Sequence, residues 1–481
     1  MPKERTGHGL SRRSVLAGLG GAAGTASLAS FAGPASAAGP LGDGRPGGGD
    51  VVIRETYVMT MDAALGDLER GDVLIRDGEI SRVGRNVPAP AATEIDGRDM
   101  ITMPGFVDTH NHLWLTQTRG YYANTPETTY FGASERFGRA FEAADMAIGT
   151  LLGDYEALAS GITTTVDFND NVRGPAFAEE PLRAHRESGI RVRFLYGAHD
   201  DLPENKTVDL HYLETLAKAW PDWSEGGRIT LGLGWRGPGS GSPAAVSVAR
   251  DEANAARRLG LPLSVHASGQ RSRTQLDGLV GGGLLGSDVQ VIHATDATGA
   301  QLAAIEKARA SIALTPVTEQ RVGYGLTRLS LYEPVSRLGL GIDGNALAGS
   351  ADMFGVMRLL ALTETGASRS ETAVRPLRLL RLATAEAARA IGMDSSIGTL
   401  TPGKRADLIM IDTREVNLGR FTGGPPYALV VYSAQPSDVK TVMVGGRLVK
   451  QDGRLLDVDL PRLRDRARAS MRAVLQRTGG G

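Results

Sequence analysis

Short apolar runs alternate with helical stretches through the middle of the chain. Stretches rich in Ala, Leu, Arg and Glu, such as 245–259 and 298–309, are typical of helices. Between the helical stretches lie eight apolar runs of four to six residues, the length of a buried strand. These runs are 105–109, 163–168, 191–196, 229–233, 262–266, 289–293, 311–314 and 338–343. Eight strand-then-helix steps predict an α/β fold, a (β/α)8 TIM barrel over residues 104–395.

Further β-like runs flank this region on both sides. Three precede it at 50–60, 72–77 and 80–83, with a hairpin signal at Asp77-Gly78. Two more follow at 406–412 and 439–446. We therefore expect a small β-sandwich domain built from both ends of the chain, residues 50–103 and 396–452. Residues 453–481 are predicted to form a C-terminal helical tail.

The N-terminal residues have the layout of a signal peptide. The twin arginines Arg12 and Arg13 precede a mildly apolar run at 15–31, and Ala35-Ser36-Ala37 is a small-residue cleavage pattern. The arginine pair indicates the Tat route. We expect a Tat signal peptide at 1–37, then a Gly/Pro-rich flexible linker at 38–49. The protein would be exported by the Tat machinery and be secreted or extracytoplasmic. A stable membrane anchor is not expected, because the run is short and rich in glycine.

Composition narrows the chemistry that the barrel can carry. The chain has 481 residues, 53 Lys and Arg, 54 Asp and Glu, and a formal charge of −1, which argues against a protein that coats nucleic acid. It has no Cys, so disulfides, thiolate metal sites and Cys nucleophiles are excluded. A G-x-S-x-G nucleophile motif is also missing from the sequence. Any metal site must use His, Asp and Glu.

Four of the eight histidines fall at the ends of predicted strands. His110 and His112 end the first strand, and a spacing of two places both on one strand face. His266 and His293 end the fifth and sixth strands, and Asp343 ends the eighth. Catalytic groups of (β/α)8 barrels lie at these carboxyl ends, so the set predicts a metal or catalytic site. Each residue alone would more often be structural. The other histidines are expected to be in the signal peptide (His8), in a polar loop (His199) or at the surface (His185 and His211).

The residues around these strands resemble the amidohydrolase superfamily of metal-dependent hydrolases. The matching motifs are PGFVDTHNH at 104–112, GIDGNA and ADMFGVMRLL within 341–360, and IGTLTPGKRADLIMID at 397–412. Within that superfamily the chain is most similar to the chlorohydrolase and cytosine-deaminase-like branch, which usually holds a single metal. A Lys near the predicted fourth strand, as in the dinuclear branches, is missing.

The resemblance implies a ligand set and a mechanism. His110, His112, His266 and Asp343 would bind one divalent ion, Zn²⁺ or alternatively Fe²⁺, beside a water molecule. Asp343 would accept a proton from that water and pass it to the leaving group. His293 would hydrogen-bond to the attacking oxygen or polarise the electrophilic centre. The expected activity is hydrolysis of a non-peptide C–N bond in a small molecule, such as a cyclic amide, an amidine or an aminated heterocycle.

Two positions depart from the deaminases of this branch. Gly269 stands where they carry a proton-shuttling Glu, and Asp296 stands where a second His often follows the sixth strand. These departures count against ordinary deamination. Glu319 could supply a catalytic carboxylate from another wall, or it could cap or salt-bridge its own loop, for example with Arg321. Two other classes stay open: a lyase or decarboxylase on the same barrel, and a non-catalytic metal- or ligand-binding protein.

Several polar residues follow the predicted strands and are candidates for substrate contacts. Each could equally be local turn chemistry. The candidates are Trp114, Gln117, Asn169, Trp235, Arg236 and Gln270. The aromatic-rich segment 119–137 is predicted to be a lid, a contact in a homo-oligomer, or simply packing on the barrel.

Overall fold

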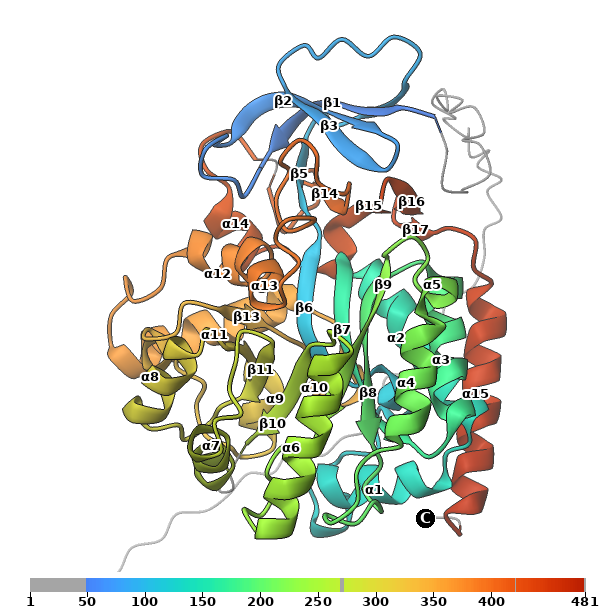
Figure 1. Cartoon of the computed structure of the whole chain (residues 1–481). Helices are drawn as coiled ribbons and strands as arrows, with labels where there is room; N and C mark the ends of the chain where they lie inside the picture. Colours follow the sequence, from blue (N-terminus) through green and yellow to red (C-terminus); the bar gives the residue numbers. More distant parts are fainter. Residues whose placement is uncertain (1–48, 269–271, 420, 480–481) are drawn as a thin grey trace, which may run out of the picture. The chain divides into compact units, whose positions relative to one another are not determined.

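Eight parallel strands form the central barrel and pair in the order in which they occur along the chain (Figure 1). The computed structural model describes residues 49–268, 272–419 and 421–479. The barrel strands are β6 (Phe106–Asn111), β7 (Ile162–Val172), β8 (Arg191–Ala198), β9 (Ile229–Trp235), β10 (Leu263–Ala267), β11 (Val289–His293), β12 (Ser311–Leu314) and β13 (Leu338–Leu340).

The first and last strands meet and bring the barrel close to closure. The Asp343 amide donates to the His110 carbonyl (2.8 Å), and the His112 amide donates to the Asp343 carbonyl (3.1 Å). The Thr109 hydroxyl donates to the Leu340 carbonyl (2.9 Å). The predicted (β/α)8 barrel is therefore confirmed, and its seam passes through three of the predicted metal ligands, His110, His112 and Asp343.

The eighth strand is shorter than its apolar run. It ends at Leu340, although the apolar run continues to 343. The Ile342 amide donates to the Asp108 carboxylate (2.9 Å) instead of to a neighbouring strand. Asp343 then adopts a φ of 71°, in the left-handed region that breaks a strand.

Helices connect the strands and cover the outside of the barrel (Figure 1). The predicted helices at 245–259 and 298–309 are α6 (Pro243–Arg258) and α8 (Gly299–Lys307). Capping explains their starts: the Ser242 side chain accepts from the Ala245 amide, and Thr298 and Gln301 form a capping box. The other helices named below are α1 (Tyr130–Ala140), α2 (Ala143–Ala159), α3 (Pro175–Ser188), α4 (Leu210–Lys218), α9 (Pro316–Arg321), α11 (Met353–Ser368) and α13 (Ala385–Ala390).

Both flanks of the barrel region contribute to one smaller, mostly antiparallel sheet. Its ladder runs β17-β16-β15-β14-β5-β1-β2-β3, with β4 paired to β1. Its strands are β1 (Val51–Val58), β2 (Leu68–Arg76), β3 (Glu79–Gly84), β4 (Thr93–Asp96), β5 (Met100–Pro104), β14 (Leu408–Asp412), β15 (Val439–Val444), β16 (Arg447–Gln451) and β17 (Arg454–Leu455). Strand β5 leads directly into barrel strand β6 through Gly105. A Cβ at position 105 would lie 2.2 Å from the Thr163 hydroxyl oxygen, so only glycine fits this crossing.

The C-terminal residues form helix α15 (Leu460–Arg477), which packs along α2. Ser470 and Arg477 both bond to the Asp145 carboxylate on α2, and Val474 is buried beneath them. Among the described residues no helix is long and apolar enough to cross a membrane. The predicted signal peptide at 1–37 lies outside the described residues.

Candidate metal centre and active site

The predicted ligands come together at the carboxyl end of the barrel. His110 lies in β6, His112 directly follows that strand, and His266 lies near the end of β10. Asp343 follows β13, and His293 is the last residue of β11. His293 and Asp343 have φ values of 72° and 71°, which side-chain-bearing residues rarely adopt. Such backbone strain is found preferentially at functional sites.

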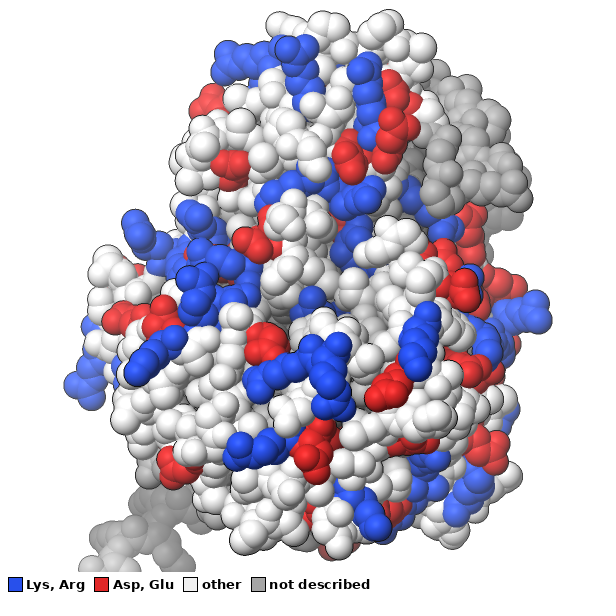
Figure 2. All heavy atoms as spheres, in the orientation of Figure 1, with Lys and Arg blue, Asp and Glu red and all other residues white. Residues whose placement is uncertain are grey.

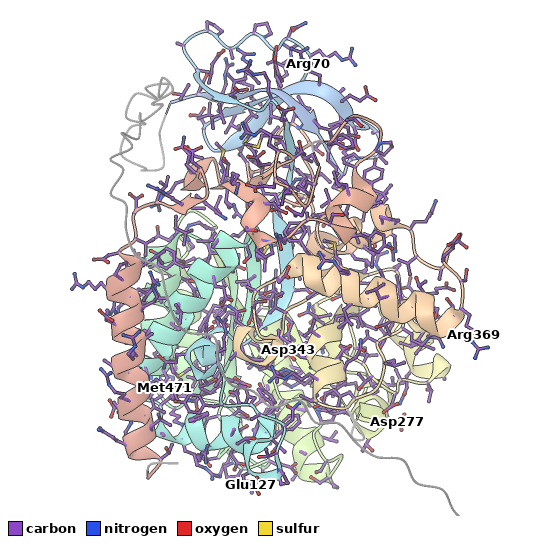
Figure 3. All side chains as sticks on the ribbon, turned by 180° about the vertical axis from the view of Figure 1, so that it is seen from behind. Arg70, Glu127, Asp277, Asp343, Arg369 and Met471 are labelled. Atoms are coloured by element: carbon purple, nitrogen blue, oxygen red, sulfur yellow. The ribbon has the colours of Figure 1, made fainter. Side chains whose placement is uncertain are left out.

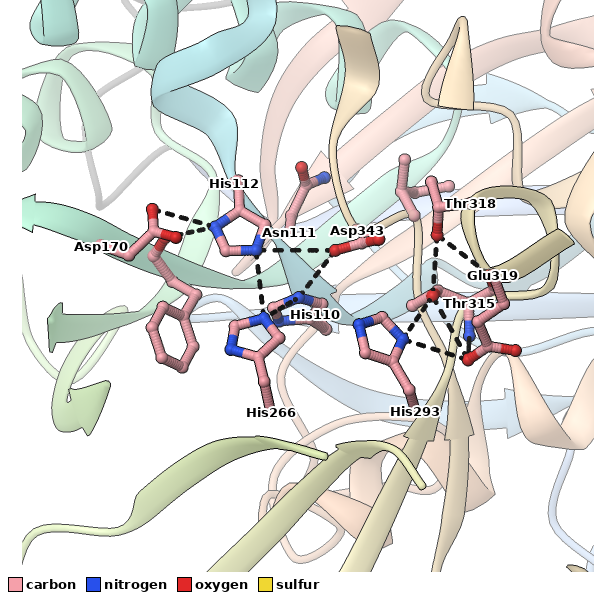
Figure 4. Close-up of polar contacts among 12 residues, drawn as sticks. His110, Asn111, His112, Asp170, His266, His293, Thr315, Thr318, Glu319 and Asp343 are labelled. Atoms are coloured by element: carbon pink, nitrogen blue, oxygen red, sulfur yellow. Dashed lines mark hydrogen bonds and ion pairs between the residues drawn. The ribbon is translucent and has the colours of Figure 1, made fainter. Parts of the chain in front are cut away.

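Four ligand atoms converge on one point (Figure 4). His266 Nε2 lies 3.2 Å from His110 Nε2 and 3.3 Å from His112 Nε2. Asp343 Oδ1 lies 2.9 Å from His110 Nε2 and 3.5 Å from His112 Nε2. All four atoms lie within 4.8 Å of one another. We call His110, His112, His266 and Asp343 the ligand quartet.

The spacing of the quartet fits a tetrahedral metal ion. Ligand bonds of about 2.0–2.1 Å, as for zinc, place the ligand atoms about 3.3–3.4 Å apart. The observed separations of 2.9 to 3.5 Å bracket this value. Three imidazoles and a carboxylate form a hard-to-borderline donor set that suits zinc or ferrous iron, and thiolates are not needed.

Hydrogen-bond partners at Nδ1 orient the ring of His112. Its Nδ1 lies 3.0 Å from the Phe168 carbonyl and 3.2 Å from Asp170 Oδ1, so Nδ1 carries the proton and Nε2 is left to face the quartet. The Trp114 indole N–H donates to the same Asp170 oxygen (2.8 Å). Carbonyl and carboxylate partners of this kind fix the tautomer of a metal-binding histidine.

Electrostatics favour the ionisation state that binds a cation for three of the four ligands, and His112 is the exception. Burial lowers the pKa of His110 to about 4 and that of His266 well below its usual value, so both rings are neutral at pH 7. Burial raises the pKa of Asp343, but its hydrogen bond with His110 and the nearby imidazoles outweigh burial and lower it. Burial lowers the pKa of His112, but Asp170 outweighs it and raises the pKa to about 9. That proton must leave when a metal binds, since ligating imidazoles are neutral.

Asp108 holds the backbone beneath the quartet. Its fully buried carboxylate accepts from the amides of Ile342 (2.9 Å) and His110 (3.3 Å), and from the Thr165 hydroxyl (2.9 Å). It also accepts from the Asn111 amide group (2.7 Å). Burial raises the pKa of Asp108 to about 7. The carboxylate thus ties β6 to the segment that carries Asp343.

His293 stands beside the quartet, with a carboxylate behind it. Its Nδ1 lies 3.2 Å from Glu319 Oε1 and 3.0 Å from the Thr315 hydroxyl (Figure 4). Glu319 is only 1% exposed, and it also accepts from the Thr315 amide (2.9 Å) and the Thr327 hydroxyl. All of these partners lie behind the His293 ring. Glu319 therefore orients His293 and does not line the pocket.

A cavity of about 450 Å³ opens beside the quartet. Aromatic side chains from α1 and from the loop after α9 form part of its wall, and carboxylates form another part. Its lining comprises His112, Trp114, Leu115, Tyr130, Phe131, Ser134, Glu135, Asp170, Asn171, Asp200, His266, Ser268, His293, Val322, Tyr324, Asp343 and Leu347. Figure 3 shows Asp343 in the interior, whereas Glu127, Asp277 and Arg369 lie at the periphery.

Among the predicted substrate-contacting residues, Trp114 lines this cavity. Trp235 does not: it is fully buried and donates its indole N–H to the Ala249 carbonyl (3.1 Å). Arg236 binds the Leu202 carbonyl (2.8 Å) and lies 3.7 Å from the Glu252 carboxylate, so it holds the loop after β8. The prediction is wrong for both, because Trp235 points into the core and the Arg236 guanidinium binds the loop after β8.

Two further predicted contacts lie away from the cavity. Asn169 is fully buried and donates to the Phe177 carbonyl (3.0 Å), and Gln117 donates to the Asp145 carbonyl (3.1 Å). Neither side chain lines the cavity. Gln270 lies outside the described residues. Residues that the sequence reasoning did not single out, Asp200 and Tyr324, line the cavity instead.

The predicted surface position of His185 is also wrong. The side chain is fully buried on α3, with Nδ1 2.9 Å from Asp154 Oδ2 and Nε2 3.1 Å from Asp167 Oδ2. Burial lowers the pKa of His185, but the two carboxylates outweigh it and raise the pKa to about 10. Asp167 Oδ1 also accepts from the amide of Leu113, directly after His112 (3.0 Å). We call His185, Asp154 and Asp167 the His185 triad.

An eight-stranded barrel with three histidines and an aspartate converging at its carboxyl end defines the class of metal-dependent barrel hydrolases. The model of the amidohydrolase family matches residues 101–449. The chain therefore belongs to the amidohydrolase family. This membership confirms the predicted activity class, hydrolysis of C–N bonds other than peptide bonds.

Relatives named as deaminases match most of the chain. The 5'-deoxyadenosine deaminase of Methanosarcina barkeri is 28% identical over 89% of this chain and 99% of its own length. The 5-methylthioadenosine/S-adenosylhomocysteine deaminase of Symbiobacterium thermophilum is 30% identical over 84% of this chain and 94% of its own.

Solved structures share the fold. An adenosine deaminase from Xanthomonas campestris with bound zinc has a TM-score of 0.76 at 21% identity, covering 89% of this chain and 99% of that one. The zinc-bound atrazine chlorohydrolase of Arthrobacter aurescens has a TM-score of 0.77 at 22% identity, covering 88% of this chain and 100% of that one. These likenesses support the barrel and its companion sheet.

Proposed function

We propose that this chain is a zinc-dependent deaminase of an aminated N-heterocycle, with the adenine ring of a 5'-modified adenosine as the leading substrate. The observation that carries the proposal is the ligand quartet beside a cavity with aromatic walls. The names of the relatives support an adenine substrate. The reaction would convert a ring C–NH₂ and water into a ring carbonyl and ammonia.

The chemistry of the site divides between the cation and the chain. When bound, a zinc ion lowers the pKa of a coordinated water toward about 7 and thereby supplies a nucleophile at neutral pH. Asp343 is ionised and lies at the same point, so it accepts the proton of the attacking water. The Nδ1 side of His293 is held by Glu319 and Thr315, which leaves Nε2 to bond to the oxygen that forms at the substrate carbon.

A residue other than the Glu that deaminases of this branch usually carry must protonate the leaving group. Position 269 is Gly, and Glu319 is committed to His293. Asp200 lines the cavity after β8, and partial burial together with Asp170 and Glu135 raises its pKa to about 6. We assign the acid role to Asp200, because a carboxyl group whose pKa lies close to neutral pH can take up a proton and donate it to the leaving group.

The cavity walls suit a flat ring. Tyr130 and Phe131 are in edge contact at 5.2 Å, and Phe131 lies 6.4 Å from Tyr324 with the two rings tilted by 30°. Phe131 is 57% exposed, so its ring face is available to a ligand. Stacking on such rings favours a planar heterocycle over a flexible amide.

Ammonia release by the zinc-loaded protein tests the proposal directly. We expect turnover of 5'-deoxyadenosine or 5'-methylthioadenosine, with oxygen from labelled water in the product. In the Asp200→Asn variant the change in activity near pH 6 should disappear from the pH profile. Ser134→Ala, also on the cavity wall, serves as the matched control. Turnover of cyclic amides without ammonia from any aminated ring would overturn the deaminase assignment. Product without oxygen from labelled water would favour the lyase or decarboxylase alternative.

We further propose that the chain is exported by the Tat machinery through residues 1–37. The support is the arginine pair Arg12 and Arg13 ahead of an apolar run and a small-residue cleavage pattern. Replacement of both arginines by lysine should abolish export of the full chain. Export that persists in the double variant would contradict the proposal.

A further inference from the structure

A second cavity lies at the opposite end of the barrel from the quartet. Its volume is about 360 Å³, and it is lined by residues at the starts of strands β10, β11 and β12 and at the end of α13. Its polar lining includes three arginines and one carboxylate: Arg193, Arg257, Arg337 and Asp288. Basic side chains are prominent around the middle of the face shown in Figure 2.

Arg193 brings an uncompensated charge into this cavity. It projects from β8 and donates from NH1 to the Ile391 carbonyl (2.8 Å), while its Nε is buried and bonds to no described residue. No carboxylate of the described chain lies within ion-pair distance of it. Burial lowers the pKa of Arg193 to about 10, and no neighbouring carboxylate counteracts burial.

Arg337, in the same lining, repeats the pattern. Its guanidinium donates to the carbonyls of Arg309 (3.1 Å) and Arg389 (3.0 Å), and its buried Nε bonds to no described residue. Burial and the charge of Arg309 lower the pKa of Arg337, and the carboxylates of Asp394 and Glu306 offset this lowering only in part. Asp288, the single carboxylate of the lining, is taken by Arg257 at 2.8 Å.

A neighbouring arginine shows how this chain compensates a buried guanidinium when no ligand is needed. Arg191, two residues before Arg193 on the same strand, forms a two-pronged ion pair with Asp407 (2.6 and 2.9 Å). An unpaired buried charge is costly, so a protein pairs it, neutralises it or binds a counter-ion. Arg193 and Arg337 are partly buried side chains that form no ion pair with a described carboxylate, and the Nε atom of each is buried without a partner.

We propose that this cavity is a binding site for a phosphate group, held between Arg193 and Arg337. Three guanidinium groups against one carboxylate leave an excess of two positive charges in the lining, which a phosphate dianion matches. Planar guanidinium donors bind tetrahedral oxyanions through paired N–H groups, and the hydroxyl of Ser311 lies in the same lining. The site is separate from the deaminase chemistry and does not depend on it.

Calorimetric titration and thermal unfolding test the site with inorganic phosphate and with glycerol 3-phosphate, against chloride at equal ionic strength. We expect saturable binding and a rise in Tm for the wild type. Arg193→Met and Arg337→Met should each weaken binding at least tenfold. Arg358→Met is the matched control, because Arg358 also has a buried, unbonded Nε and donates to a carbonyl, that of Ala434, but lies outside the cavity.

The outcomes separate the source of the phosphate from the existence of the site. Binding of inorganic phosphate assigns the free ion, and binding of the ester alone assigns a phosphorylated small molecule. An Asp343→Asn protein should still bind phosphate, because the proposed cavity does not involve the metal centre. If phosphate instead bound at the metal centre, this variant would lose the binding. The site is overturned if the wild type shows no saturable response to either anion, or if all three arginine variants respond as the wild type does.

Discussion

The ligand quartet and the His185 triad both combine histidine and aspartate in the barrel interior, and they are built in opposite ways. In the triad each nitrogen of one imidazole faces a carboxylate, at 2.9 Å and 3.1 Å. In the quartet the Nε2 atom of His266 lies 3.2–3.3 Å from those of His110 and His112, with one carboxylate among them. In the triad the two N–H groups of His185 donate to the two carboxylates, so every group has a partner. In the quartet the ligand atoms converge on one point.

The difference identifies which cluster needs a cation. Two carboxylates hold His185 in its charged form, and all of its N–H groups are donated. Imidazoles whose Nε2 atoms converge cannot all hydrogen-bond to one another, so a shared Lewis acid is the partner that satisfies them. Convergence of the ligand atoms, and not the mere proximity of histidines, is what indicates a metal site.

The largest effect is expected from Asp343→Asn. The change removes a ligand and the proton acceptor, so kcat should fall by about 10²–10⁴-fold. Steady-state kinetics on the zinc-loaded protein measure the loss, and circular dichroism checks that the fold is kept. Activity close to that of the wild type would remove Asp343 from the mechanism.

Glu319→Gln should have a smaller effect on turnover. Glutamine keeps one oxygen to accept from the Thr315 amide, and its NH2 group can donate to the Thr327 hydroxyl, but the charge behind His293 is lost. We expect kcat to fall by about 10–100-fold with KM little changed, as for other partners that orient a site histidine. The pH dependence of kcat should shift as well. An unchanged kcat across pH would mean that Glu319 is only a structural residue of its loop.

His185→Gln is expected to destabilise the protein and leave the metal centre occupied. Removing one partner of a buried ionic cluster costs about 3–5 kcal/mol of unfolding free energy. Denaturant titration measures this loss. The control is His211→Gln on α4, where an exposed histidine should change stability by less than about 0.5 kcal/mol. Equal effects of the two variants would contradict the buried role of His185.

The triad also predicts a pH dependence of stability. The pKa of His185 is raised to about 10 in the folded protein, above its usual value of about 6.5 in an unfolded chain. Its contribution is therefore fully present below pH 6.5 and is lost as the pH rises toward 10. The stability difference between the wild type and His185→Gln should shrink between pH 6.5 and 10. A difference that grows over this range would contradict a charged His185.

Much of the barrel could be predicted from the sequence because strand pattern and topology determine it. Regular strand-then-helix steps place His110, His112, His266 and Asp343 at one end, and chain order alone brings them together. The direction in which each side chain points is harder to predict from the sequence. Asp170 faces the cavity while its neighbour Asn169 is buried, so a shift of one residue decides which of them can meet a substrate.

His185 could have been found from its own helix. Ala178, Leu182 and His185 follow one another at spacings of four and three, and all are buried on the same face of α3. The two carboxylates that hold the ring come from α2 and β7 and are not visible in that pattern. At the opposite end of the barrel, the sequence likewise does not show which arginines form an ion pair with a carboxylate, because the partners are far apart in the chain.

The most direct test of the central claim is the metal content of three proteins purified without chelators: the wild type, His185→Gln and Asp343→Asn. Converging ligand atoms predict about one divalent ion per chain, mainly zinc, in the wild type and in His185→Gln, and almost none in Asp343→Asn. A wild type without metal, or an Asp343→Asn protein with as much metal as the wild type, would contradict the account.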